Sequence, residues 1–175
     1  MGAVLRDLAV VVVLAGLSGC ADTGAPPAPE TALSPAPIVK REGVSLAEAT
    51  VAVVSLDGAP GAASLAFNQA LSKQFQARGI VSAAPGKAHY LLRAYLAASS
   101  APEGASLDYV VDVFDARRIR LARLSDGFAV KGTGDAWSLM SDVSLEAVAG
   151  QCADEVAAFL SNAPEAKPAA LSYAN

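Results

Sequence analysis

The spacing of apolar residues changes along residues 50–161, and this change constrains the fold more than any other feature. Residues 50–56 (TVAVVSL) form a short β-branched run closed by the turn residues 57–61 (DGAPG). Such a run is typical of a buried strand. Residues 62–79 then space their apolar side chains as a helix does, and the segment ends on Gly79, a natural helix stop. The chain is therefore predicted to pass from strand to helix within a few residues.

The elements predicted after this helix are three strands and a second helix. Residues 90–97, 107–114 and 118–130 have strand patterns, and residues 145–160 have apolar side chains at helical spacing. Within the third strand, Asp126-Gly127 is compatible with either a bulge or a two-residue turn. The order β-α-β-β-β-α predicts an α+β fold with a mostly antiparallel sheet and two helices packed on one face.

The N-terminus carries an apolar run that ends in a cysteine. Residues 8–17 are apolar and follow a single cation, Arg6. The run is too short for a spanning helix, which needs about 20 apolar residues. The tetrapeptide Leu17-Ser18-Gly19-Cys20 resembles the lipobox of bacterial lipoproteins. The resemblance implies that Leu17, Ser18 and Gly19 are recognised by the signal peptidase and that Cys20 receives the lipid.

Cleavage before Cys20 implies a protein that faces the periplasm and is anchored in the cell envelope by its acyl chains. In enteric bacteria an Asp directly after the cysteine favours retention in the inner membrane. Here Ala21 follows Cys20, so we expect the outer membrane rather than the inner membrane. An uncleaved hydrophobic anchor and a plain secretory signal are the alternative interpretations.

Four segments follow from these patterns. Residues 1–19 are predicted to be a lipoprotein signal peptide, and residues 20–46 the lipidated cysteine with a proline-rich tether. Residues 47–162 are predicted to form the periplasmic domain, and residues 163–175 a disordered tail. The net charge of −4 argues against nucleic acid as a partner. The expected partners are the membrane, through the lipid on Cys20, and an envelope protein.

Residues able to do chemistry are scarce. His89 is the only histidine, and no G-x-S-x-G motif accompanies it, which argues against an enzyme. One histidine and one spare cysteine, Cys152, do not suit zinc, and we expect no metal or cofactor. The helical spacing around Cys152 predicts a buried, inert thiol. Asp108 and Asp112 lie four apart on a strand, about 13 Å, so we expect solvated or hairpin-facing aspartates.

A basic segment that contains Arg117, Arg118, Arg120 and Arg123 is the local exception to the acidic balance of the chain. Arg118 and Arg120 alternate with Ile119 and Leu121, which predicts one cationic and one apolar strand face, and Arg123 follows. Such a face is either a solvated edge that discourages aggregation or a contact for an acidic partner or an envelope glycan. Trp137, in a short turn before the last helix, is a further candidate for partner contact.

The element order is similar to that of the N-terminal domains of periplasmic lipoprotein accessory factors. These include penicillin-binding-protein activators, curli-type secretion lipoproteins and the auxiliary lipoproteins of lipid-transport systems. The segments 57–61, 111–116 and 135–137 resemble uncharacterised lipoproteins of alphaproteobacteria. The resemblance implies a non-enzymatic accessory module for an envelope assembly, transport or cell-wall complex.

Two alternatives to the accessory module remain open. One is a binder of a lipid or a peptidoglycan fragment that uses the space between sheet and helices, with Trp137 and Tyr109 at its mouth. The other is a hydrolase with an unrecognised site.

Overall fold

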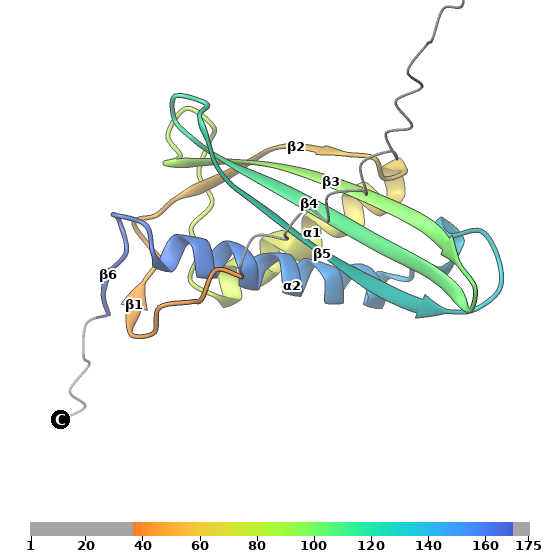
Figure 1. Ribbon diagram of the computed structural model, residues 1–175. Helices are drawn as coiled ribbons and strands as arrows, with labels where there is room; N and C mark the ends of the chain where they lie inside the picture. Colours follow the sequence, from red (N-terminus) through yellow and green to blue (C-terminus); the bar gives the residue numbers. More distant parts are fainter. Residues whose placement is uncertain (1–36, 170–175) are drawn as a thin grey trace, which may run out of the picture. The chain divides into compact units, whose positions relative to one another are not determined.

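A computed structural model describes residues 37–169 of the chain (Figure 1). The elements in chain order are β1 (Val44–Ser45), β2 (Val51–Asp57), α1 (Gly61–Ala77), β3 (Tyr90–Ala101), β4 (Gly104–Asp115), β5 (Arg120–Lys131), the 3₁₀ turn η1 (Trp137–Leu139), α2 (Asp142–Ser161) and β6 (Lys167–Pro168). The predicted α+β class is confirmed, and so is the order β-α-β-β-β-α, which runs from β2 to α2. The short strands β1 and β6 are additions to it.

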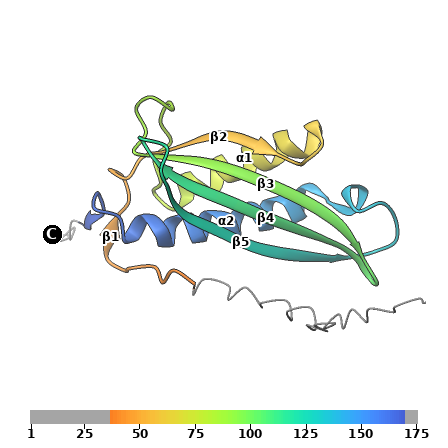
Figure 2. The same ribbon diagram turned by 45° about the horizontal axis from the view of Figure 1, so that its top comes forward.

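The main sheet has the strand order β2-β3-β4-β5. Strands β3, β4 and β5 form an antiparallel meander, while β2 pairs in parallel with β3 because α1 carries the chain back to the same end. The β3–β4 hairpin closes tightly, since Ala101 and Gly104 are paired residues. Both helices lie on one face of this sheet, as the two views agree (Figures 1 and 2).

Strand β5 passes through Asp126-Gly127 without interruption. Gly127 pairs with Asp108 in an unbroken stretch of register, so neither a bulge nor a turn occurs there. The register shifts instead between Val113 and Phe114. A glycine suits position 127 because a Cβ would lie 2.6 Å from the Asp108 carboxylate oxygen Oδ1.

The face of the sheet that carries the helices is filled by apolar side chains, and we call it the covered face. Its fully buried members include Leu92, Leu96, Leu107, Tyr109, Val111 and Val113. Each large side chain buried in this way contributes about 2 kcal/mol. Phe67 of α1 and Val148 of α2 pack against them at 0 % exposure. The predicted burial of Cys152 is confirmed at 1 % exposure, and burial raises its pKa to about 12.

The two helices are fastened by Arg78, which follows the last residue of α1. Its Nε donates to Asp154 Oδ1 at 2.7 Å, and its Nη2 donates to the carbonyl of Gly150 at 3.1 Å. Helix α2 begins at a capping serine, because the Ser141 hydroxyl accepts a hydrogen bond from the amide of Ser144 at 3.2 Å. The Arg78 contacts thus join the two helices, and the Ser141 cap stabilises the start of α2.

The folded unit extends beyond the predicted limits 47–162. Strand β1 pairs with β6, and the amide of Ala169 donates to the carbonyl of Gly43 at 2.8 Å. The prediction of a disordered tail is therefore wrong for residues 163–169. The end of the predicted tether, residues 37–46, likewise belongs to the fold. These pieces lack apolar periodicity, so their order comes from contacts with distant parts of the chain rather than from local pattern.

The predictions for the two ends of the chain fall outside the described residues. They concern the signal peptide 1–19 with Leu17, Ser18, Gly19 and Cys20, the tether 20–36 and the tail 170–175. Within residues 37–169, neither helix is long and apolar enough to cross a membrane.

Candidate binding face on the open side of the sheet

The face of the sheet turned away from the helices, the open face, carries charged and polar side chains. Strand alternation places alternate residues of β3, β4 and β5 there. Three of them lie in one row across the strands, since Asp112 is the register partner of both Arg93 and Arg123. The open face therefore has an arginine–aspartate–arginine row at its centre.

Asp112 organises this row. Its side chain is 5 % exposed. Arg123 donates two hydrogen bonds to it, from Nε to Oδ1 at 2.8 Å and from Nη2 to Oδ2 at 2.7 Å. Arg120 Nη1 lies 3.7 Å from Oδ1. The hydrogen bond from Arg123 lowers the pKa of Asp112 against the effect of burial, and the charges of Arg120 and Arg93 lower it further. Asp112 thus faces its hairpin partner, as predicted, but it is buried rather than solvated.

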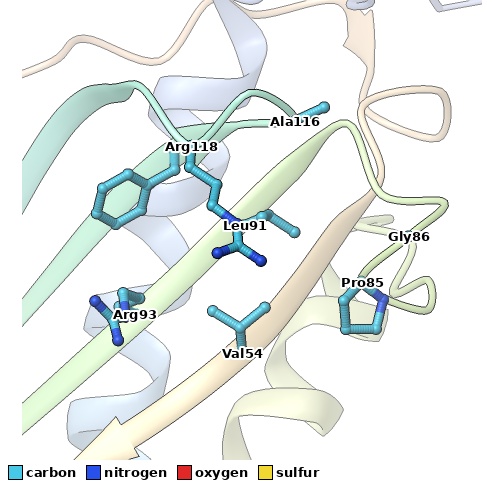
Figure 3. A pocket seen from close by; sticks show the side chains of 8 residues that line it. Val54, Pro85, Gly86, Leu91, Arg93, Ala116 and Arg118 are labelled. Atoms are coloured by element: carbon cyan, nitrogen blue, oxygen red, sulfur yellow. The ribbon is translucent and has the colours of Figure 1, made fainter.

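Beside this row lies a hollow of about 620 Å³, which we call the arginine hollow. Its apolar floor contains Val54, Leu91 and Phe114, and its arginines are Arg93 of β3 and Arg118 of the β4–β5 turn. Figure 3 shows Arg118 reaching across Leu91 toward Val54, with Arg93 further along the same strand as Leu91. The hollow therefore combines cationic groups with an apolar surface.

Two irregularities of the backbone build this hollow. The register between β2 and β3 shifts between Val53 and Ser55, so Val54 is the extra residue of a bulge. Arg118 has a φ of 65°, a left-handed conformation that costs a non-glycine residue about 1 kcal/mol. The Asp115 carboxylate holds the turn, because its Oδ1 accepts the amide of Ile119 at 2.8 Å.

The predicted alternation of the basic segment is wrong. Strand β5 begins at Arg120, and Arg118 lies in the turn before it. Ile119 also precedes β5, so it shares no strand face with Leu121; the two side chains are 58 % and 49 % exposed. The left-handed turn at Arg118 and the register shift that leaves Leu121 without a partner on β4 break the two-residue period. Arg118, Arg120 and Arg123 nevertheless lie on or beside the open face.

Trp137 is not brought together with these arginines. It lies in η1, half-buried, and lines a separate hollow of about 360 Å³ with Pro60, Ala63 and Leu145. Tyr109, predicted with Trp137 at the mouth of a pocket, is 1 % exposed, and its hydroxyl donates to Glu155 Oε2 at 2.9 Å. Tyr109 is thus part of the core, which corrects its placement at a pocket mouth.

Of the eight residues that line the arginine hollow, only Arg118 was predicted as a site residue; Arg93 and the floor residues Val54, Leu91 and Phe114 were not. Strand alternation could have found Arg93, because it lies between the inward-facing Leu92 and Ala94. The bulge that adds Val54 left no signal in the sequence.

His89 is exposed, and its Nδ1 lies 3.0 Å from the Thr50 hydroxyl. Among the described residues, no group of three or more His, Cys, Asp or Glu side chains is arranged to hold a metal ion.

Comparisons with known proteins give likenesses at low identity. No family model matches the sequence, and no curated protein matches it. A solved minor lipoprotein from Acinetobacter baumannii is 13% identical with a TM-score of 0.48, covering 64% of this chain and 94% of that one. A chain of the PelC dodecamer from Paraburkholderia phytofirmans is 13% identical with a TM-score of 0.46, covering 71% of this chain and 95% of that one. Lipoprotein GNA1162 from Neisseria meningitidis is 10% identical with a TM-score of 0.38, covering 61% of this chain and 97% of that one.

Proposed function

We propose that this chain is a membrane-anchored lipoprotein of the cell envelope that acts as a non-enzymatic binding module for an envelope protein complex. The observation that carries the proposal is the open face, where Arg93, Arg120 and Arg123 surround the single carboxylate of Asp112. Half of each side chain of Arg120 and Arg123 stays exposed at 53 %. These arginines can therefore still contact a partner.

The charge of this face is opposite to that of the whole chain. The chain carries a net charge of −4, yet arginines outnumber carboxylates around Asp112. Segregated charge of this kind steers a partner of opposite sign to one surface and selects its orientation. Arginine is also enriched at protein interfaces. An acidic protein surface is the partner that this arrangement favours.

The anchor part of the proposal stands on the sequence. Cys20 follows an apolar run and two small residues, and it precedes a proline-rich stretch. At about 3.1 Å per residue, such a tether would hold the domain several tens of ångströms from the lipid. We place the domain in the periplasm, on the outer membrane in preference to the inner membrane.

A Cys20→Ser variant tests the anchor. It should lose labelling by radioactive fatty acid and move from the membrane fraction to the soluble periplasm. Retained lipid labelling would exclude Cys20 as the attachment site. A Cys152→Ser variant is the matched control, and it should keep its lipid and its membrane fraction.

Site-specific photo-crosslinking in living cells tests the binding module. A photo-reactive residue at the exposed position Ser125 of the open face should give a discrete crosslinked protein, while one at Gln69 on the outer side of α1 should not. The product should weaken when Arg120 is replaced by Glu, because that change reverses the charge of the face. Equal products from both positions, or none from either, would contradict the proposal.

A second candidate is a binder of a lipid or a peptidoglycan fragment. The volume of the arginine hollow, about 620 Å³, favours it, since small-molecule sites span roughly 300–1,000 Å³. Native mass spectrometry of the protein released gently from membranes should then show a retained ligand. A spectrum of the bare chain would contradict this candidate.

A further inference from the structure

We infer that the arginine hollow receives an acidic segment of the partner protein, with a carboxylate between Arg93 and Arg118 and a neighbouring apolar side chain on the floor. This inference rests on the proposed function and specifies its contact. Three features of the hollow support it: its charge, its apolar floor and its opening onto the sheet.

The two arginines of the hollow have no ion pair within the described fold, although the charge of Arg93 acts on the nearby Asp112. Asp112 pairs with Arg123 and Arg120, but neither Arg93 nor Arg118 forms an ion pair with any residue of 37–169. A guanidinium binds a carboxylate through two parallel hydrogen bonds, which makes it specific for planar anions. The two guanidiniums beside this hollow are therefore suited to bind a carboxylate of a partner protein.

The floor of the hollow is apolar and accessible. Val54 is 40 % exposed, and Leu91 and Phe114 are half-buried. Covering such side chains removes apolar surface from water and adds affinity. A fully charged or fully polar ligand would leave this surface unused. A carboxylate next to an apolar side chain matches both parts of the hollow.

The shape of the hollow favours a peptide segment over a free small molecule. Figure 3 shows its side chains standing on a sheet surface rather than around an enclosed chamber. Small-molecule sites bury about 70–90% of their ligand, which an open surface does not do. The arginines continue across the strands from Arg93 to Arg123, so a segment lying over the sheet meets further cations.

The backbone of Arg118 adds an independent argument. A φ of 65° is a conformation that glycine adopts without cost. Arginine at this position strains the turn, and such strain is found at ligand-binding sites more often than elsewhere. What arginine supplies here, and glycine would not, is the guanidinium that crosses the hollow.

Fluorescence binding measurements with the full mature chain test the inference. The probes are short labelled peptides in which glutamates flank Leu or Phe, and the same peptides with glutamine in place of glutamate. Inorganic phosphate and phosphatidylglycerol vesicles are the probes for the other anion sources. The test variant is Arg93→Gln/Arg118→Gln. The control is Arg117→Gln, which removes the same kind of charge from the same turn outside the hollow.

We expect the glutamate peptides to bind the wild-type chain at least tenfold more tightly than the glutamine peptides, since a charged hydrogen-bonded pair is worth roughly that factor. The double variant should lose this difference, and Arg117→Gln should keep it. Equal binding of the two peptide sets, or unchanged binding by the double variant, would overturn the inference. So would tighter binding of vesicles or phosphate that depends on Arg93 and Arg118.

The outcomes separate this inference from the proposed function. Crosslinking from Ser125 that survives the Arg93→Gln/Arg118→Gln change would leave the binding module standing and remove the hollow as its contact. Loss of both the crosslink and the peptide binding in the double variant would support both. Absence of any crosslink from the open face would remove the proposed function itself.

Discussion

The two faces of the sheet are built from the same strands and yet follow different rules. On the covered face, alternate residues such as Leu107, Tyr109 and Val111 are at most 1 % exposed and pack on the helices. On the open face, the residues between them are organised by charge around Asp112. Packing therefore stabilises one face, while the other holds three arginines around the one carboxylate of Asp112, which neutralises them only in part.

A buried carboxylate on the open face and a half-buried one on the helix side show the same contrast. Asp112 on the open face has a lowered pKa, because Arg123 donates hydrogen bonds to its ionised form. Glu155 of α2 has a raised pKa, because burial outweighs the hydrogen bond from Tyr109 and Asp126 lies nearby. The open face thus favours charge, and the helix side disfavours it.

The largest expected difference between the faces concerns apolar volume. Val110 and Val111 are neighbours on β4 that point to opposite faces. Val111→Ala should lower the free energy of unfolding by about 2–3 kcal/mol, because it leaves a cavity in the core. Val110→Ala, the control, should cost less than about 1 kcal/mol. Urea denaturation measures both, and equal losses would show that something else covers the open face.

The next effect concerns the buried charge. Asp112→Asn should lower the free energy of unfolding at neutral pH by about 1–2 kcal/mol, because it removes the carboxylate that Arg123 and Arg120 share. The half-exposed arginines limit the loss through solvent screening. Asp108→Asn is the control on the same strand, since Asp108 is exposed and has no ion pair within residues 37–169.

The pH dependence of the free energy of unfolding shows whether the ionised carboxylate of Asp112 stabilises the folded chain. The folded pKa of Asp112 lies below its ordinary value of 3.8, so the unfolded chain binds more protons between the two values. The stabilisation is present above pH 3.8 and is lost as the pH falls through the folded pKa. Chemical denaturation across this range should show a smaller acid loss for Asp112→Asn than for the wild-type chain. Identical acid profiles would contradict the assignment.

A gain in stability is expected at the hollow. Arg118→Gly should raise the free energy of unfolding by about 1 kcal/mol, because glycine relieves the left-handed backbone. The same variant should bind the glutamate peptides more weakly. Thermal unfolding and peptide titration measure the two effects on one sample. A variant that is less stable than the wild-type chain would show that Arg118 contributes to the fold.

The smallest effect is expected at the helix side. Glu155→Gln should raise the free energy of unfolding at neutral pH by about 0.5 kcal/mol after solvent screening, because it removes a disfavoured charge and keeps an acceptor for Tyr109. The folded pKa of Glu155 lies above 4.5, so the wild-type chain loses stability as the pH rises through it. The variant should lack that loss in urea denaturation at pH 5 and above, and a decrease in stability would contradict the prediction.

Periodicity along the sequence is sufficient to predict the fold class and the burial of the core. The change from two-residue to helical spacing predicted β2, α1, the meander and α2, because these elements bury one face and show it as a period. The same spacing predicted the buried Cys152. It also identified the basic segment that contributes Arg118, Arg120 and Arg123.

The tertiary structure alone decided the site. Residues 37–46 and 163–169 join the fold through pairing between the two ends of the chain, which no local pattern encodes. The bulge at Val54 and the left-handed turn at Arg118 are deviations from the period, so a periodic analysis passes over them. Arg93 and Arg118 lie 25 positions apart in the sequence and line the same hollow because β3 and β4 form a hairpin. Charged residues from distant parts of the sequence come together only when strands pair. Burial, by contrast, follows the alternation of residues along each single strand.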